Sequence, residues 1–153
     1  MKPRVCPVVL HVVLPVAVGA ALYTAFRERG LLVFGWYEQA GLGGAVEAVR
    51  SFTMPAAPFL PRPLIYSLPD GLWVYALTAL MARLWSGERG FYRTFWLSTG
   101  LLCGPVAELL QIPRWVPGTF DPADFVITAA AFAAALFNAR ADRGARATEP
   151  QPC

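Results

Sequence analysis

The feature that most constrains this chain is a long apolar segment near its start. Residues 5–26 form a run of 22 residues that contains no Asp, Glu, Lys or Arg. At a rise of about 1.5 Å per residue, a helix of that length crosses the roughly 30 Å hydrocarbon core of a bilayer. We therefore predict a transmembrane helix here. A cleaved signal peptide is the alternative, since the small residues at 18–21 are typical of a cleavage site.

The composition of the whole chain agrees with a membrane protein. Of the 153 residues, 56% are hydrophobic and 15% are charged, whereas a soluble domain carries about 25% charge. The mean hydropathy is +0.47. The net charge of +3 comes from arginines placed singly between apolar stretches, which is not the pattern of a phosphate-binding face. These values exclude a nucleic-acid module and an ordinary cytosolic enzyme.

Three further apolar segments predict an all-α polytopic fold with four transmembrane helices. Two of them begin with a helix-start pattern, in which a side chain caps the helix, a proline follows and a carboxylate lies in the first turn. The caps are Ser67 in Ser67-Leu-Pro-Asp70 and Asp121 in Asp121-Pro-Ala-Asp124. The three predicted spans cover residues 67–85, 94–112 and 122–139.

The region between the first two spans is different, because charges, glycines and prolines interrupt residues 31–66. It is predicted to be a connecting loop at the outer surface. Leu42, Val46 and Val49 fall on one helical face within it, which favours a short helix in the membrane interface. We expect one transmembrane domain over residues 1–139 and a disordered cytoplasmic tail over residues 140–153.

The distribution of basic residues predicts the orientation. The side of the N-terminus holds eight basic residues, against five on the opposite side. The eight are Lys2, Arg4, Arg83, Arg89, Arg93, Arg140, Arg143 and Arg146, and the five are Arg27, Arg29, Arg50, Arg62 and Arg114. Basic residues favour the cytoplasmic side, so both termini are expected in the cytoplasm. Aromatic residues lie near both predicted membrane surfaces, as in an aromatic belt. The expected location is the inner (cytoplasmic) membrane of a bacterium.

This topology gathers polar residues at the outer ends of spans two to four, and they are the predicted binding site. The site residues are Asp70, Glu108, Gln111, Asp121, Asp124 and Thr128. A carboxylate at membrane depth usually faces a bundle interior or a wet cavity. Glu108 lies within a predicted span, so of the six residues its position most needs a functional explanation. It is either neutral and donating to Gln111 or Asp124, or ionised and paired with a ligand or with Arg114. The simpler alternative is that the aspartates only cap helices and Glu108 only holds a hairpin together.

Signals for other chemistry are weak. His11, the only histidine, lies far from the acidic cluster, so no catalytic triad is predicted. Cys6, Cys103 and Cys153 lack the spacing of a disulfide framework or of a zinc site. We expect no catalytic residue, metal or other cofactor. The weaker alternative is a hard cation such as Ca²⁺ or Mg²⁺ held by the carboxylates.

Gly100 and Gly104 have the spacing that lets another helix approach closely. That helix belongs either to the same bundle or to a second copy, which would make a homodimer. The other expected partners are the lipid bilayer, an envelope lipid or another membrane protein, and no nucleic acid.

The polar cluster also carries a family resemblance. Glu108-Leu-Leu-Gln111, the turn with Gly118, and Asp121-Pro-Ala-Asp124 before an apolar helix resemble the signature of the VanZ-like family of small bacterial membrane proteins. The similarity covers residues 101–136, and residues 68–73 resemble the acidic start of the family's second helix. The departures are Thr128 in place of Asn, Ala131 and Ala135 in place of glycines, Thr119 near the expected Arg and Trp73 in place of His.

The resemblance implies a four-helix inner-membrane protein, linked in the founding member to glycopeptide (teicoplanin) resistance. We therefore expect a non-catalytic accessory role in cell-envelope maintenance or antibiotic tolerance. Two alternatives remain open, a small proton- or cation-coupled transporter that uses Glu108 and a membrane enzyme that acts on an envelope lipid.

Overall fold

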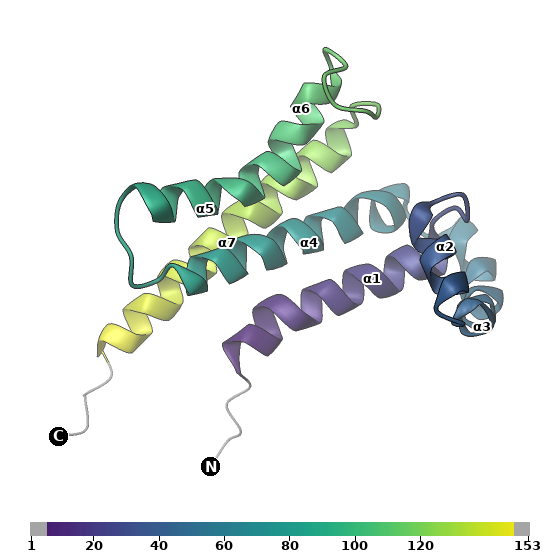
Figure 1. Ribbon diagram of the computed structural model, residues 1–153, viewed down its shortest axis with the longest axis horizontal. Coiled ribbons are helices and arrows are strands. Elements are labelled where there is room, and N and C mark those ends of the chain that lie inside the picture. Colours follow the sequence, from purple (N-terminus) through teal and green to yellow (C-terminus); the bar gives the residue numbers. More distant parts are fainter. Residues whose placement is uncertain (1–5, 149–153) are drawn as a thin grey trace.

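The computed structural model describes residues 6–148, with side chains up to residue 141. This part of the chain is built of helices and turns and contains no β-strand (Figure 1). The all-α prediction is therefore confirmed. Lys2, Arg4 and Cys153, which entered the predictions above, lie outside the described residues.

Three described helices are long and apolar enough to cross a membrane. The first joins a π-helical turn, η1 (Val9–Val13), to α1 (Leu14–Phe26) and covers 18 residues. The second is α4 (Arg62–Leu84), and the third is the part Pro122–Ala141 of α7 (Pro122–Thr148). The prediction of apolar helices long enough to span a membrane is confirmed in these three regions. The helical structure of α7 continues to Thr148, past the predicted end of the last span at residue 139.

The segment predicted as the third span is helical but bent. It consists of α5 (Phe91–Leu101), a π-helical turn η3 (Leu102–Val106) and α6 (Ala107–Gln111). Pro105 lies inside the π-helical turn, and a proline removes one backbone donor and bends a helix. Figure 1 shows this segment running from the α4–α5 turn to the start of α7, with a change of direction between α5 and α6. It is not one of the three candidate spans.

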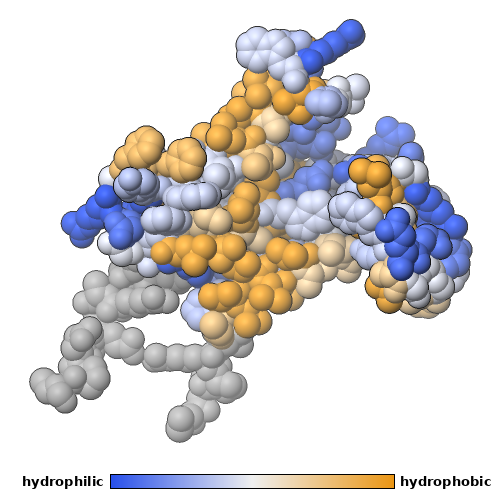
Figure 2. Space-filling model, viewed as in Figure 1, coloured by the Kyte–Doolittle hydropathy of each residue, from blue (hydrophilic) through white to orange (hydrophobic). Residues whose placement is uncertain are grey.

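Helix α4 is the centre of the bundle and packs against α1, α5 and α7. Its buried face carries small side chains, including Ala76, Thr78 and Ala79, which are at most 1% exposed. Small residues let helix backbones approach closely. In Figure 2 hydrophobic residues follow the middle of the helices, while hydrophilic residues gather at α2 and α3 and near the α4–α5 turn. That pattern is typical of a bundle whose two ends face water.

Both glycines of the GxxxG pair are buried inside this bundle. A Cβ at Gly100 would clash with Thr78 Oγ1, and a Cβ at Gly104 would lie 2.8 Å from Val74 Cγ2 and 3.2 Å from Thr128 Cβ. Their close approach is therefore to α4 and α7 of the same chain. The homodimer through these glycines stays a prediction.

The expected start of the second span was wrong. Helix α4 begins at Arg62, after Pro61, so that Ser67 lies inside the helix and is 1% exposed rather than capping it. Pro63 occupies the first turn, where a missing backbone donor costs nothing because that position has no helical acceptor. Pro69 lies inside the helix, which packed membrane helices tolerate.

The region between the first two spans is more helical than expected. It contains α2 (Leu32–Gln39), α3 (Gly43–Thr53) and a 3₁₀ helix, η2 (Met54–Phe59). The predicted short helix is confirmed as α3, whereas the expectation of loop elsewhere in this region was wrong. Arg50 of α3 is 7% exposed and donates to the carbonyl oxygens of Thr24 and Arg27 at 2.9 and 2.8 Å. A cation at a helix C-terminus satisfies its free carbonyls, so α3 is held against the end of α1.

Candidate functional site

A cavity of about 380 Å³ lies where four helical segments meet. It is lined by Asp70, Trp73, Val74 and Leu77 of α4, Cys103 and Gly104 of η3, Glu108 of α6, and Thr128 of α7. Three of the six predicted site residues, Asp70, Glu108 and Thr128, therefore line one space. They come from three different helices, although up to 58 positions separate them in the sequence.

Glu108 links α6 to the start of α7. Gln111 Nε2 donates to Glu108 Oε1 at 3.3 Å, and the backbone N–H of Asp121 points to Glu108 Oε2 at 3.5 Å. The expected contact between Glu108 and Gln111 is present, with Gln111 as the donor. Gln111 does not line the cavity, and its Oε1 is buried with no hydrogen-bond partner among the described residues.

The two aspartates at the start of α7 have different surroundings. Asp121 Oδ1 accepts from the Ala123 N–H at 2.8 Å, which confirms the predicted helix cap. Asp124 lies in the first turn of α7, and its Oδ1 is buried with no partner in the described part of the chain. Thr128 Oγ1 donates to the Asp124 carbonyl at 2.7 Å. Neither aspartate lines the cavity, so both flank it.

Arg27 is the residue of this site that the sequence analysis missed. Its Nη2 lies 3.2 Å from Asp70 Oδ2 and donates to the Tyr66 carbonyl at 3.1 Å. Its guanidinium carbon lies 5.2 Å from the ring centroids of Tyr23 and Tyr66, within the range of cation–π attraction. Its place in the sequence could have predicted it, because Arg27 directly follows the first predicted span, on the same side of the membrane as Asp70.

Arg114, the basic residue expected near Glu108, adopts a left-handed conformation with φ of 59° in the turn after α6. No ion pair joins it to Glu108 in the described structure. The carboxylate that is ion-paired at this site is that of Asp70. The ion pair of this site therefore joins the residue after α1 to α4.

A second group of polar side chains lies in the bundle outside the lining of the cavity. His11 Nδ1 is 2.6 Å from the Tyr75 hydroxyl oxygen, which accepts from Asn138 Nδ2 at 3.1 Å. These side chains join η1, α4 and α7. His11 is therefore a hydrogen-bonded residue of the bundle.

The cavity presents two carboxylates, a hydroxyl group, an indole and the thiol of Cys103. Over the described residues, no group of three or more His, Cys, Asp and Glu side chains is close enough to hold a metal ion. The two carboxylates can accept a proton or a hydrogen bond, including one from a cationic group. Comparison of the chain with family models, characterised proteins and solved structures finds no match.

Proposed function

We propose that this chain is a VanZ-like, four-span protein of the bacterial inner membrane, with both termini in the cytoplasm. In this proposal the cavity between α4, α6 and α7 opens at the extracytoplasmic face and binds a ligand. The role is accessory and non-catalytic, in envelope maintenance or glycopeptide tolerance. The observation that carries it is the convergence of Asp70, Glu108 and Thr128, from three helices, on one cavity.

This convergence supports a binding role for a physical reason. Carboxylates are expensive at membrane depth and usually face a partner, a pathway or a ligand. Arg27 is the partner of Asp70, whereas the hydrogen bonds to Glu108 come from the neutral donors Gln111 and Asp121 N–H. Glu108 is therefore the carboxylate best suited to a ligand that carries a donor or a positive charge.

The same residues favour one alternative, a small proton- or cation-coupled transporter. Two carboxylates line the cavity and one arginine is paired with Asp70, so the site has one carboxylate, that of Glu108, in excess. An excess carboxylate inside a bundle is the usual element of a proton relay. Proton flux into proteoliposomes, present with the native chain and absent with Glu108→Gln, would favour this alternative over an accessory role.

Glu108→Gln tests the proposed function directly, because the amide keeps the size of the side chain and removes the charge. We expect a folded protein that fails to complement the envelope phenotype of a deletion strain. Glu88→Gln is the matched control, since Glu88 lies in the turn at the other end of α4 and does not line the cavity. Full activity of Glu108→Gln would show that Glu108 only stabilises the hairpin of α6 and α7.

Cys103 offers a direct probe of the cavity, because it is exposed and lines it. In a chain with Cys6 and Cys153 replaced by serine, a membrane-impermeant thiol reagent is expected to label Cys103 from outside intact cells. Single cysteines placed near Gly43 and Pro117 should also be labelled. Cysteines in the 86–90 turn and after Asn138 should be protected, and labelling of that turn would reverse the orientation and place the cavity on the cytoplasmic side.

A further inference from the structure

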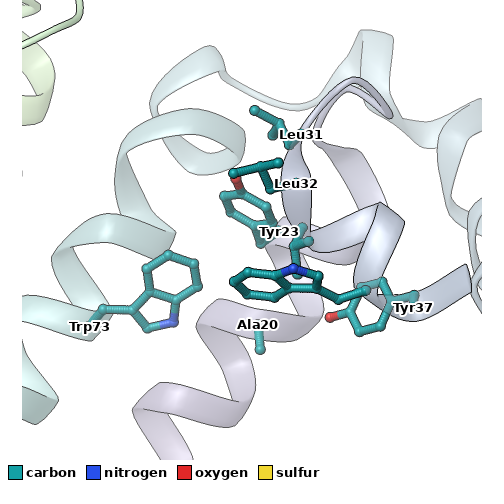
Figure 3. Close-up of a pocket in the computed structure, with 8 residues that line it drawn as sticks. Ala20, Tyr23, Leu31, Leu32, Tyr37 and Trp73 are labelled. Atoms are coloured by element: carbon teal, nitrogen blue, oxygen red, sulfur yellow. The ribbon is translucent and has the colours of Figure 1, made fainter. Parts of the chain in front are cut away.

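A second pocket, of about 460 Å³, is lined by residues of α1, α2 and α4 and shares Trp73 with the acidic cavity. Its other walls include Tyr23 of α1 and Leu32, Trp36 and Tyr37 of α2. Figure 3 shows Trp73 and Tyr37 on opposite sides of the pocket, with Ala20 and Tyr23 of α1 between them. The volume falls in the range of about 300–1,000 Å³ that is typical of small-molecule sites.

The lining of this pocket is apolar in chemistry. The Tyr37 hydroxyl forms a 3.0 Å hydrogen bond with Thr24 Oγ1, so its polar end is engaged within the protein and its ring is left for the pocket. Leu32 is 81% exposed and Trp36 is 64% exposed. Tryptophan at the end of an apolar span is typical of the membrane interface, and exposed leucine beside it has hydrocarbon as its favourable surrounding.

We propose that this pocket binds one acyl chain of an anionic glycerophospholipid from the surrounding leaflet, with the phosphate of that lipid beside Arg27. The site is separate from the proposed ligand cavity and goes beyond the proposed function. Two of its walls belong to the candidate spans Val9–Phe26 and Arg62–Leu84, around which acyl chains pack in a bilayer. The third wall, α2, has 8 residues and is about 12 Å long at 1.5 Å per residue, which is too short to cross a bilayer. It lies at the end of α1 (Figure 1).

Arg27 provides the charge complementarity. Its guanidinium carbon lies 5.2 Å from the ring centroid of Tyr23, one wall of the pocket. Both of its hydrogen bonds, to Asp70 and to the Tyr66 carbonyl, use Nη2, so Nη1 forms no hydrogen bond within the described residues. Its Nε is buried, which leaves Nη1 as the donor for a phosphate. The residue directly follows the last position of the first span, at the depth where basic side chains meet lipid headgroups. A phosphodiester there would add an anionic acceptor to an arginine whose donors are only partly used.

Tryptophan fluorescence tests this site in the full chain. Trp85, Trp96 and Trp115 are replaced by phenylalanine so that Trp36 and Trp73 report on the pocket. The protein is reconstituted in phosphatidylcholine vesicles that contain a rising fraction of phosphatidylglycerol with dibrominated acyl chains, which quench nearby indoles. We expect quenching that saturates at a low fraction of the brominated lipid. A matched chain that keeps only Trp115, which is 78% exposed and outside the pocket, should be quenched in proportion to that fraction.

Two variants locate the effect. Leu32→Asp places a charge in the pocket at a position exposed enough for the fold to accept it, and it should convert saturating quenching into proportional quenching. Arg27→Gln should remove the preference for brominated phosphatidylglycerol over brominated phosphatidylcholine. Proportional quenching of the native pocket, or equal quenching by both lipids, would overturn the proposal. Protection from both lipids in a chain that sediments as a dimer would also overturn it, because a second copy would then cover the pocket.

Discussion

Replacing Gly100 with alanine is expected to destabilise the bundle through a steric clash inside one chain. The new Cβ would meet Thr78 Oγ1 at a clashing distance and Phe132 Cδ2 at 3.3 Å. Thr78 is 0% exposed, and its hydroxyl donates to the Val74 carbonyl at 2.8 Å. The threonine therefore cannot move away without losing that hydrogen bond or shifting α4.

The size of the effect follows from two opposing terms. Overpacking a buried site costs about 1–3 kcal/mol, while Gly to Ala inside a helix gains up to about 1 kcal/mol in propensity. Gly35→Ala is the matched control, because Gly35 lies in α2 and a Cβ there would meet nothing within 4 Å. The control has the propensity gain alone. We therefore expect Gly100→Ala to be less stable than Gly35→Ala by about 1–3 kcal/mol, the overpacking term.

Thermal unfolding of the purified protein in detergent measures this difference, and light scattering of the same samples measures the mass of the particle. Thr78→Ala removes the hydroxyl that clashes with the new Cβ. Gly100→Ala should therefore cost less stability in a Thr78→Ala chain than it costs in the native chain. Gly100→Ala as stable as Gly35→Ala would refute the intramolecular packing. A loss of dimers at unchanged stability would support the homodimer interpretation.

Two other substitutions have expected outcomes that the same unfolding assay checks. Asp121→Ala removes the acceptor of the Ala123 N–H and should lower the free energy of unfolding by about 0.5–2 kcal/mol. Asp121→Asn should nearly preserve the cap. Equal losses of stability in the two variants would show that Asp121 acts through its charge. Arg27→Gln removes the ion pair with Asp70, whose two side chains are 24% and 37% exposed. We expect a loss between the roughly 1 kcal/mol of exposed pairs and the 3–5 kcal/mol of buried ones. An unchanged midpoint of thermal unfolding for Arg27→Gln would mean that water solvates Asp70 when Arg27 is absent.

The sequence was most informative where a signal was local. Apolar length predicted the three candidate spans, and a carboxylate before Pro122 predicted the cap at Asp121. The same pattern failed at Ser67, because two earlier prolines, Pro61 and Pro63, offered a start that the chain uses instead. Arg27 was missed for a different reason, since its partner lies 43 positions away and no periodicity connects the end of one span with the first turns of another.

The acidic cavity depends on a feature that apolar patterns do not reveal, the bend in the segment 91–111. Pro105 and the π-helical turn around it redirect the helix, so that α6 leaves α4 and follows the start of α7 (Figure 1). Glu108 can then reach the Asp121 N–H, while Gly104, just before the bend, still packs on Val74. The space between these two contacts is the cavity that Asp70 lines from α4. A straight helix would keep the side chains of α6 against α4, so the bend both creates the cavity and turns Glu108 toward α7.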